Sequence, residues 1–170
     1  MYVKTEASTG TLATIRFYYL KTSIFNEIKL LTAYRSRTIK EADGKEGWDE
    51  FTVTDSERDF FNNFLQYVLP EVFGELAKIA SGVPDSVFAE DDSSTGAEMG
   101  FSLKDNEAYD DNLLTIIDGR IRKCFVLYCL KEWWLHTAYD SIAAMYELKY
   151  RESLGEMKRK AWQLIKPLML

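Results

Sequence analysis

The chain has 170 residues, of which 21 are basic and 27 acidic, so its formal net charge is −6 at neutral pH. This length favours one domain, 1–170, and a hydrophobic fraction of 46% is too high for a largely disordered chain. Nine glycines and three prolines exclude collagen-like and proline-rich chains. The acidic balance argues against specific nucleic-acid binding, which needs Lys and Arg.

The N-terminal segment, about 1–22, differs from the rest of the chain. Residues 1–10 contain no apolar run, so no signal peptide is predicted. The run 11–20 is rich in β-branched and aromatic residues, which favours a strand or an extended arm. The longest uncharged run, 60–70, is far shorter than the about 20 apolar residues of a membrane span, so no membrane contact is predicted.

Two helices are predicted in the first half. The first covers about 23–40, with Ser23 as its N-cap. A polar turn at 43–47 follows, and we expect Trp48 and Phe51 to attach this loop to the core.

The second helix begins at a capping box formed by Thr54 and Glu57. It contains a dense set of aromatic residues between 60 and 68. Pro70 removes a helical hydrogen bond and clashes with the preceding turn, so a break or kink is predicted near Leu69, with a continuation over 71–80.

Residues 85–111 are strongly acidic. They contain nine acids and one base, a net charge of −8. Apolar runs at 86–89 and 99–103 predict two short strands around a flexible tip at 92–96. A solvated loop is an equally good interpretation of this insertion.

The C-terminal third returns to strong helical patterns. Residues 113–134 are apolar on most sides, which indicates a central helix or an interface helix. A last helix is predicted at about 138–165, apolar on one face and charged on the other. Residues 119–170 carry a net charge of +5, so an acidic middle precedes a basic end. The predicted fold is mainly α, a bundle of four to five helices with a short β-hairpin or extended arm.

Motifs for catalysis or metal binding are weak. His136 is the only histidine, and Asp140 lies one turn further on, but no Ser or Cys nucleophile completes a triad. A histidine beside a helix–helix turn explains His136 equally simply. The pairs Asp91–Asp92 and Asp110–Asp111 offer oxygen ligands without a calcium-loop pattern, so solvated acids are the simpler interpretation.

Zinc and nucleotide motifs are absent from the sequence, so we predict no enzyme, no metal, no cofactor and no small-molecule ligand. Cys124 and Cys129 are five residues apart, about 140° around a helix, and should not bond to each other. Two free thiols fit a reducing compartment.

The aromatic and charged residues suggest a protein interface. Trp133 and Trp134 point about 100° apart on a helix, so one of them is a candidate for contact with a partner. The alternative is that different neighbouring helices bury both. The candidate interface residues are Trp133, Trp134, Lys158, Arg159, Lys160, Asp91 and Asp92.

Three segments together resemble a family of small helical proteins encoded in phages and prophages of Bacteroidetes. They are Asn-Glu-Ile-Lys-Leu-Leu-Thr-Ala-Tyr-Arg at 26–35, Thr-Val-Thr-Asp-Ser-Glu-Arg-Asp-Phe-Phe at 52–61, and the run from 113 to 160 that ends in Lys-Arg-Lys. The resemblance covers about two-thirds of the chain. Its motifs are packing and capping patterns.

Such proteins resemble phage head–tail connectors, or neck adaptors. The resemblance implies a ring of identical subunits between portal and tail proteins, located in the virion after assembly in the bacterial cytoplasm. It implies no cofactor and no catalytic residues. Two alternatives remain open, namely a non-virion protein-binding or assembly module of a mobile element and a small enzyme that uses His136 and Asp140.

Overall fold

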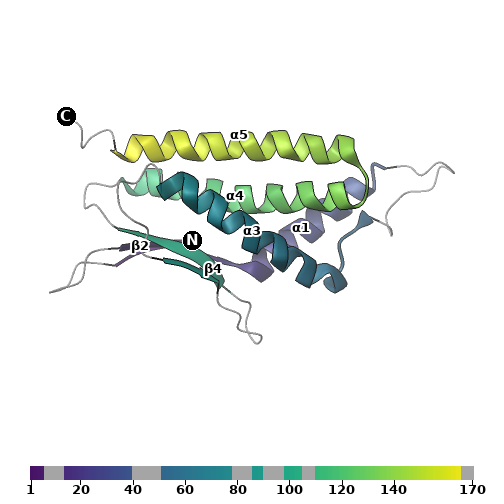
Figure 1. Ribbon diagram of the computed structural model, residues 1–170, viewed down its shortest axis with the longest axis horizontal. Coiled ribbons are helices and arrows are strands. Elements are labelled where there is room, and N and C mark those ends of the chain that lie inside the picture. Colours follow the sequence, from purple (N-terminus) through teal and green to yellow (C-terminus); the bar gives the residue numbers. More distant parts are fainter. Residues whose placement is uncertain (6–13, 40–50, 78–85, 90–97, 105–109, 166–170) are drawn as a thin grey trace.

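The computed structural model describes residues 1–5, 14–39, 51–77, 86–89, 98–104 and 110–165. Over these residues the chain is mainly helical, and its four long helices confirm the predicted bundle. The sheet lies on one side of α4 and α5 on the other (Figure 1). In chain order the elements are β1 Tyr2–Thr5, β2 Thr14–Leu20, α1 Lys21–Ser36, the 3-10 turn η1 Asp55–Glu57, α3 Arg58–Ala77, β3 Ser86–Ala89, β4 Glu98–Lys104, α4 Asp111–His136 and α5 Asp140–Ile165.

The described strands form one antiparallel sheet in the order β1-β2-β4-β3. Strand β2 pairs with β4 along its length, with Phe17 opposite Phe101. Alternate residues of β2 (Ile15, Phe17 and Tyr19) are buried while Arg16 is exposed, as expected of a sheet with one face on the core. The two strands predicted at 86–89 and 99–103 are confirmed, and the sheet joins them to the N-terminal strand.

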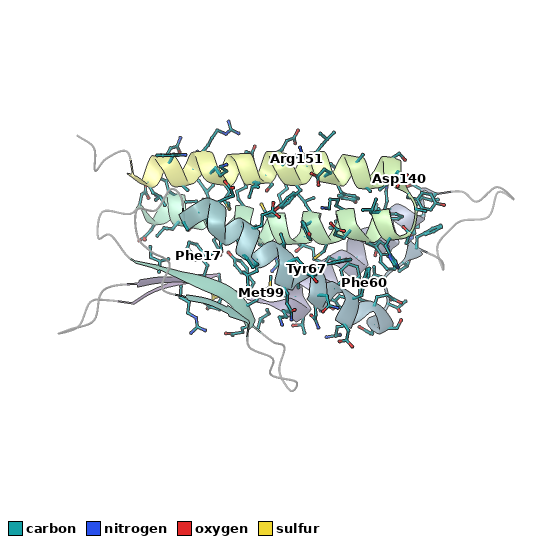
Figure 2. All side chains as sticks on the ribbon, viewed as in Figure 1. Phe17, Phe60, Tyr67, Met99, Asp140 and Arg151 are labelled. Carbon is teal, nitrogen blue, oxygen red and sulfur yellow. The ribbon has the colours of Figure 1, made fainter. Side chains whose placement is uncertain are left out.

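The sheet is fixed to α4 through Tyr19. Its ring packs edge-on against Phe125 with 5.3 Å between the ring centroids, and its hydroxyl donates a 2.7 Å hydrogen bond to Oδ1 of Asp118. Phe17 and Met99 lie beside it on the same buried face, between the strands and the helices (Figure 2). The side chains of this face therefore form part of the same hydrophobic core as the helices.

Helix α1 begins earlier than predicted. It starts at Lys21, directly after β2, and Leu20 at its N-cap position makes no side-chain hydrogen bond. The prediction that Ser23 caps this helix is wrong, because Ser23 lies inside the first turn and accepts hydrogen bonds from Nη2 of Arg122 at its carbonyl (3.3 Å) and hydroxyl (3.2 Å). Burial of apolar residues such as Ile28 stabilises the helix in place of a cap.

The start of α3 follows the sequence closely. Oγ1 of Thr54 accepts from the Ser56 amide at 3.4 Å, and Oε2 of Glu57 accepts from the Thr54 amide at 2.7 Å. The predicted capping box is therefore confirmed, although the first turn that it closes is the 3-10 turn η1.

Of the break or kink predicted near Leu69, the break is absent, since α3 continues through Pro70 to Ala77. Proline leaves the carbonyl four residues earlier, that of Gln66, without its helical donor. Pro70 and Gln66 are both exposed, so water can satisfy that carbonyl, while Leu69 and Val72 on either side of the proline are buried. Packing of both halves against the core outweighs the local penalty.

Helices α4 and α5 form an antiparallel hairpin that matches the two helices predicted there. Helix α4 is the central element and contacts α1, α3, α5 and β1. The buried residues of α4 are Leu114, Ile117, Ile121, Cys124, Phe125, Val126, Leu127, Cys129, Leu130, Trp133 and Trp134. The partner face of α5 is buried at Ile142, Tyr146, Tyr150, Met157 and Ala161.

The turn between α4 and α5 places an alanine in the left-handed region. The amide of Tyr139 donates to the Trp134 carbonyl at 2.9 Å, which closes the end of α4, and Ala138 has φ = 62°. This position favours glycine, because a Cβ atom there meets the backbone.

We expect Ala138→Gly to raise the free energy of unfolding by about 1 kcal/mol, because glycine adopts this φ without steric cost. Urea denaturation measures the change. Ala144→Gly, at an exposed position inside α5, is the matched control and should lower stability by about 1 kcal/mol. A loss of stability in both variants would contradict the strain assigned to Ala138.

Candidate protein-interaction surface

The two adjacent tryptophans lie in the core. The ring of Trp133 packs against Phe61 of α3 at 5.7 Å, and its Nε1 donates to the Phe51 carbonyl at 3.1 Å. The ring of Trp134 is fully buried between Phe51 and Tyr139. The candidate interface role of Trp133 and Trp134 is therefore wrong, because different neighbours within the chain bury the two rings, as the alternative interpretation of the sequence allowed.

Phe51 is buried, as predicted, and connects the residues before α3 to the core through its contacts with Trp134 and Tyr139. Trp48 and the turn at 43–47 lie outside the described residues, so their predicted placement stays a prediction.

His136 and Asp140 do not form the pair that an acid–base mechanism needs. Both are exposed, with His136 at the last residue of α4 and Asp140 at the first residue of α5. The imidazole lies against the Phe60 ring with 4.8 Å between centroids, and no hydrogen bond joins it to Asp140. Figure 2 shows Asp140 at the N-terminal end of α5, beside the interhelical turn. This is the placement beside a helix–helix turn that the sequence also allowed.

The two cysteines are free and buried, and they do not bond to each other, as predicted. Burial raises the pKa of the Cys124 thiol from its ordinary value of 9.0 to about 11. Burial also raises the pKa of Cys129. Neither thiol is therefore prepared to act as a nucleophile at neutral pH.

The acidic candidates divide into two groups. Asp110 caps α4, with Oδ1 accepting from the Asn112 amide at 2.8 Å, and Asp111 is exposed beside it. Asp91 and Asp92 lie outside the described residues. Within the described parts of the chain, no three His, Cys, Asp or Glu side chains come together as metal ligands. The helices described here also contain no apolar stretch long enough to cross a bilayer.

The basic cluster at 158–160 is split between two flanks of α5. Nζ of Lys158 forms a 2.5 Å ion pair with Glu75 of α3, so this lysine binds within the chain. The Arg159 side chain is 76% exposed, and its Nη2 lies 3.9 Å from Oε1 of Glu156, which is long for an ion pair. Nζ of Lys160 donates to Oε1 of Gln163 at 3.2 Å.

Arg159 and Lys160 line a shallow depression of about 180 Å³ at the end of the α4–α5 hairpin. The other lining residues are Arg120, Glu156 and Gln163. Arg120 and Glu156 form a 2.6 Å ion pair across the two helices. The depression therefore has three basic side chains and one carboxylate.

A larger depression of about 400 Å³ adjoins it, between α1 and α5 with α4 beneath; we refer to it as the α1–α5 groove. Leu31 of α1, Leu127 and Leu130 of α4 and Tyr146 of α5 contribute apolar side chains to it. The charged residues of its lining are Arg120, Lys123, Lys149, Glu152 and Glu156, and Ser153 completes the lining. Nζ of Lys149 lies 5.4 Å from the centroid of the Tyr146 ring.

Several apolar side chains are exposed on α1 and α5, the helices that border the larger depression. On α1, Leu30 is 66% and Tyr34 is 72% exposed, and on α5 Trp162 is 51% exposed. Aromatic residues with this exposure are common in protein contacts. The sequence did not single out Trp162, Lys123 or Lys149 as interface candidates; the net positive charge of 119–170 was a signal for the two lysines, and nothing pointed to Trp162.

Comparisons with known proteins add no relative. No protein-family model matches the sequence, and no match is found among curated proteins or among solved structures.

Between pH 9 and pH 10 we expect the free energy of unfolding to fall by about 1 kcal/mol for the Cys124 thiol alone. The raised pKa keeps this thiol protonated in the folded chain, whereas the unfolded chain loses the proton above its ordinary pKa of 9.0, so stability is lost as pH rises.

Urea denaturation at both pH values measures the effect. Cys124→Ala lowers stability at each pH because it leaves a cavity, yet it should reduce the loss between the two pH values. An unchanged loss in this variant would show that the Cys124 proton is not the cause.

Proposed function

We propose that the protein is a non-catalytic structural subunit that binds copies of itself head to tail in a ring, as a phage head–tail connector does. Its proposed partners are further copies of the chain and the portal and tail proteins of a virion assembled in the bacterial cytoplasm. The observation that carries the proposal is the basic lining of the depression at the end of the α4–α5 hairpin, which needs an acidic surface opposite it in a protein contact.

Positive charge gathers on the α5 side. Arg159, Lys160 and Arg120 line the depression at the end of the α4–α5 hairpin, with Glu156 as its one carboxylate. This end of α5 lies on the side of α4 away from the sheet (Figure 1). Burial of these basic groups by a partner needs carboxylates opposite them.

The negative charge is concentrated in the segment 85–111, which contains β3 and β4. Strand β3 ends at Ala89, two residues before Asp91 and Asp92, and β4 begins at Glu98. The described acids Asp110 and Asp111 follow β4 along the chain. The acidic segment of one copy and the basic depression of the next attract each other and favour a head-to-tail contact that a ring can close.

Exposed apolar side chains support a protein contact over simple solvation of the charges. Trp162 lies one turn of α5 beyond Lys158 and Arg159 and is half exposed. A contact that combines an exposed aromatic ring with a basic rim has the composition of a protein interface.

We expect the purified protein to form species larger than a monomer, and the population of these species should fall when salt rises from about 50 mM to about 0.5 M, because salt screens exposed charges. Sedimentation velocity over a concentration series measures this. A strict monomer at every salt and protein concentration would overturn the proposed ring.

Charge reversal tests the two sides directly. Arg159→Glu with Lys160→Glu should prevent self-association, and so should Asp91→Lys with Asp92→Lys. Mixing the two variants should restore association, because each surface of one variant then meets a surface of opposite charge on the other. Arg151→Glu is the matched control, since Arg151 is exposed on the other flank of α5 (Figure 2).

Self-association of both charge-reversed proteins at the level of the unchanged chain would contradict the proposed contact. Purified virions test the location: absence of the protein from particles that contain portal and tail proteins would favour a non-virion assembly role.

A further inference from the structure

The α4–α5 hairpin has two flanks, and within the chain one of them already holds a helix. Helix α3 packs against α4 and α5, and its Val68, Val72 and Leu76 are buried. Its Glu75 forms the 2.5 Å ion pair with Lys158 of α5. An amphipathic helix with an acidic edge is thus the chemistry that this hairpin accepts on its α3 flank.

On the opposite flank, none of the helices in the described part of the chain packs along α5. Helix α1 packs on α4, behind it in the view of Figure 1, while α3 lies in front. Between α1 and α5 the structure has the α1–α5 groove of about 400 Å³ instead of a packed helix. Leu31, Leu127 and Tyr146 supply the apolar walls and floor of this groove, on the flank of the hairpin opposite α3.

The charges around this groove favour an acidic occupant. Lys123 and Lys149 line it together with Arg120, and Arg159 and Lys160 extend the basic lining into the adjoining depression. The α1–α5 groove itself has three basic and two acidic side chains, Glu152 and Glu156, and Arg120 already neutralises Glu156 through their ion pair. Apolar contacts alone would accept any hydrophobic helix, whereas these lysines select for carboxylates at its edges.

We infer that the α1–α5 groove binds an amphipathic helix with acidic edges from a different protein. The helix places apolar residues at i, i+3/i+4 and i+7 against Leu31, Leu127 and Tyr146, and its carboxylates face Lys123 and Lys149. The exposed Leu30 and Tyr34 extend the apolar surface of α1 beyond the groove. This site goes beyond the proposed ring contact, which uses Arg159 and Lys160.

Two synthetic peptides test the inference with the full chain. One is a fluorescent amphipathic helix of about three heptads built from leucine and glutamate, and the other replaces every glutamate with lysine. Fluorescence anisotropy should show binding of the Leu/Glu peptide, with at least tenfold weaker binding of the Leu/Lys peptide. Absence of binding, or equal binding of the two peptides, would overturn the inference.

Variants locate the bound peptide. Leu31→Glu and Lys149→Glu should each weaken binding of the Leu/Glu peptide at least tenfold, because each adds a carboxylate to the lining. Both residues are partly or fully exposed, so the variants should fold, and urea denaturation checks this. Arg151→Glu has the same charge change two residues from Lys149 on the other flank of α5 and should bind the peptide normally.

Sedimentation velocity of the same variants separates this site from the ring contact. Leu31→Glu and Lys149→Glu should self-associate as the unchanged chain does, whether or not that chain forms a ring. Loss of self-association in these variants without loss of peptide binding would assign the groove to a second copy and overturn the inference of a different partner.

Discussion

The need to cover α4 controls the rest of the structure. Eleven residues of this 26-residue helix are buried, and they point in nearly every direction around its axis. One neighbour cannot cover such a surface, so α5, α3, α1 and the sheet each take a sector of it. The Tyr19–Phe125 ring contact and the Trp133–Phe51 hydrogen bond are two specific interactions that hold neighbouring segments against α4. Removing any one sector would expose a strip of apolar surface to water.

The same arrangement places α5 and the strands on different sides of α4 (Figure 1). Among the described residues, charged side chains of neighbouring helices form ion pairs such as Lys158–Glu75 and Arg120–Glu156. The incomplete cover on the flank between α1 and α5 is the second consequence, since α1 packs on α4 and leaves the α1–α5 groove beside α5.

Local features could be predicted from the sequence, and features set by distant residues could not. The Thr54–Glu57 capping box depends on residues three positions apart, and the stripe of α5 repeats every turn. The pairing of β2 with β4 joins segments about 80 residues apart, so neither strand contains a signal for the other. The sequence could not show that the helix continues through Pro70. The cost of the proline is local, whereas the packing of Leu69 and Val72 that outweighs it involves distant residues. The groove depends on how α1 leaves α4, which no spacing in the sequence records.

The pairing of β2 with β4 also has a kinetic consequence. Tyr19 and Met99 face each other although 80 positions separate them, and the loop that joins them must close before any hydrogen bond between these two strands forms. The α4–α5 hairpin needs only the short turn at Ala138, so its contacts carry little of this entropic cost. When the full chain refolds, the pairing of β2 with β4 should therefore form after the helical hairpin has begun to assemble, and until then the apolar face of β2 stays open to contact with other chains.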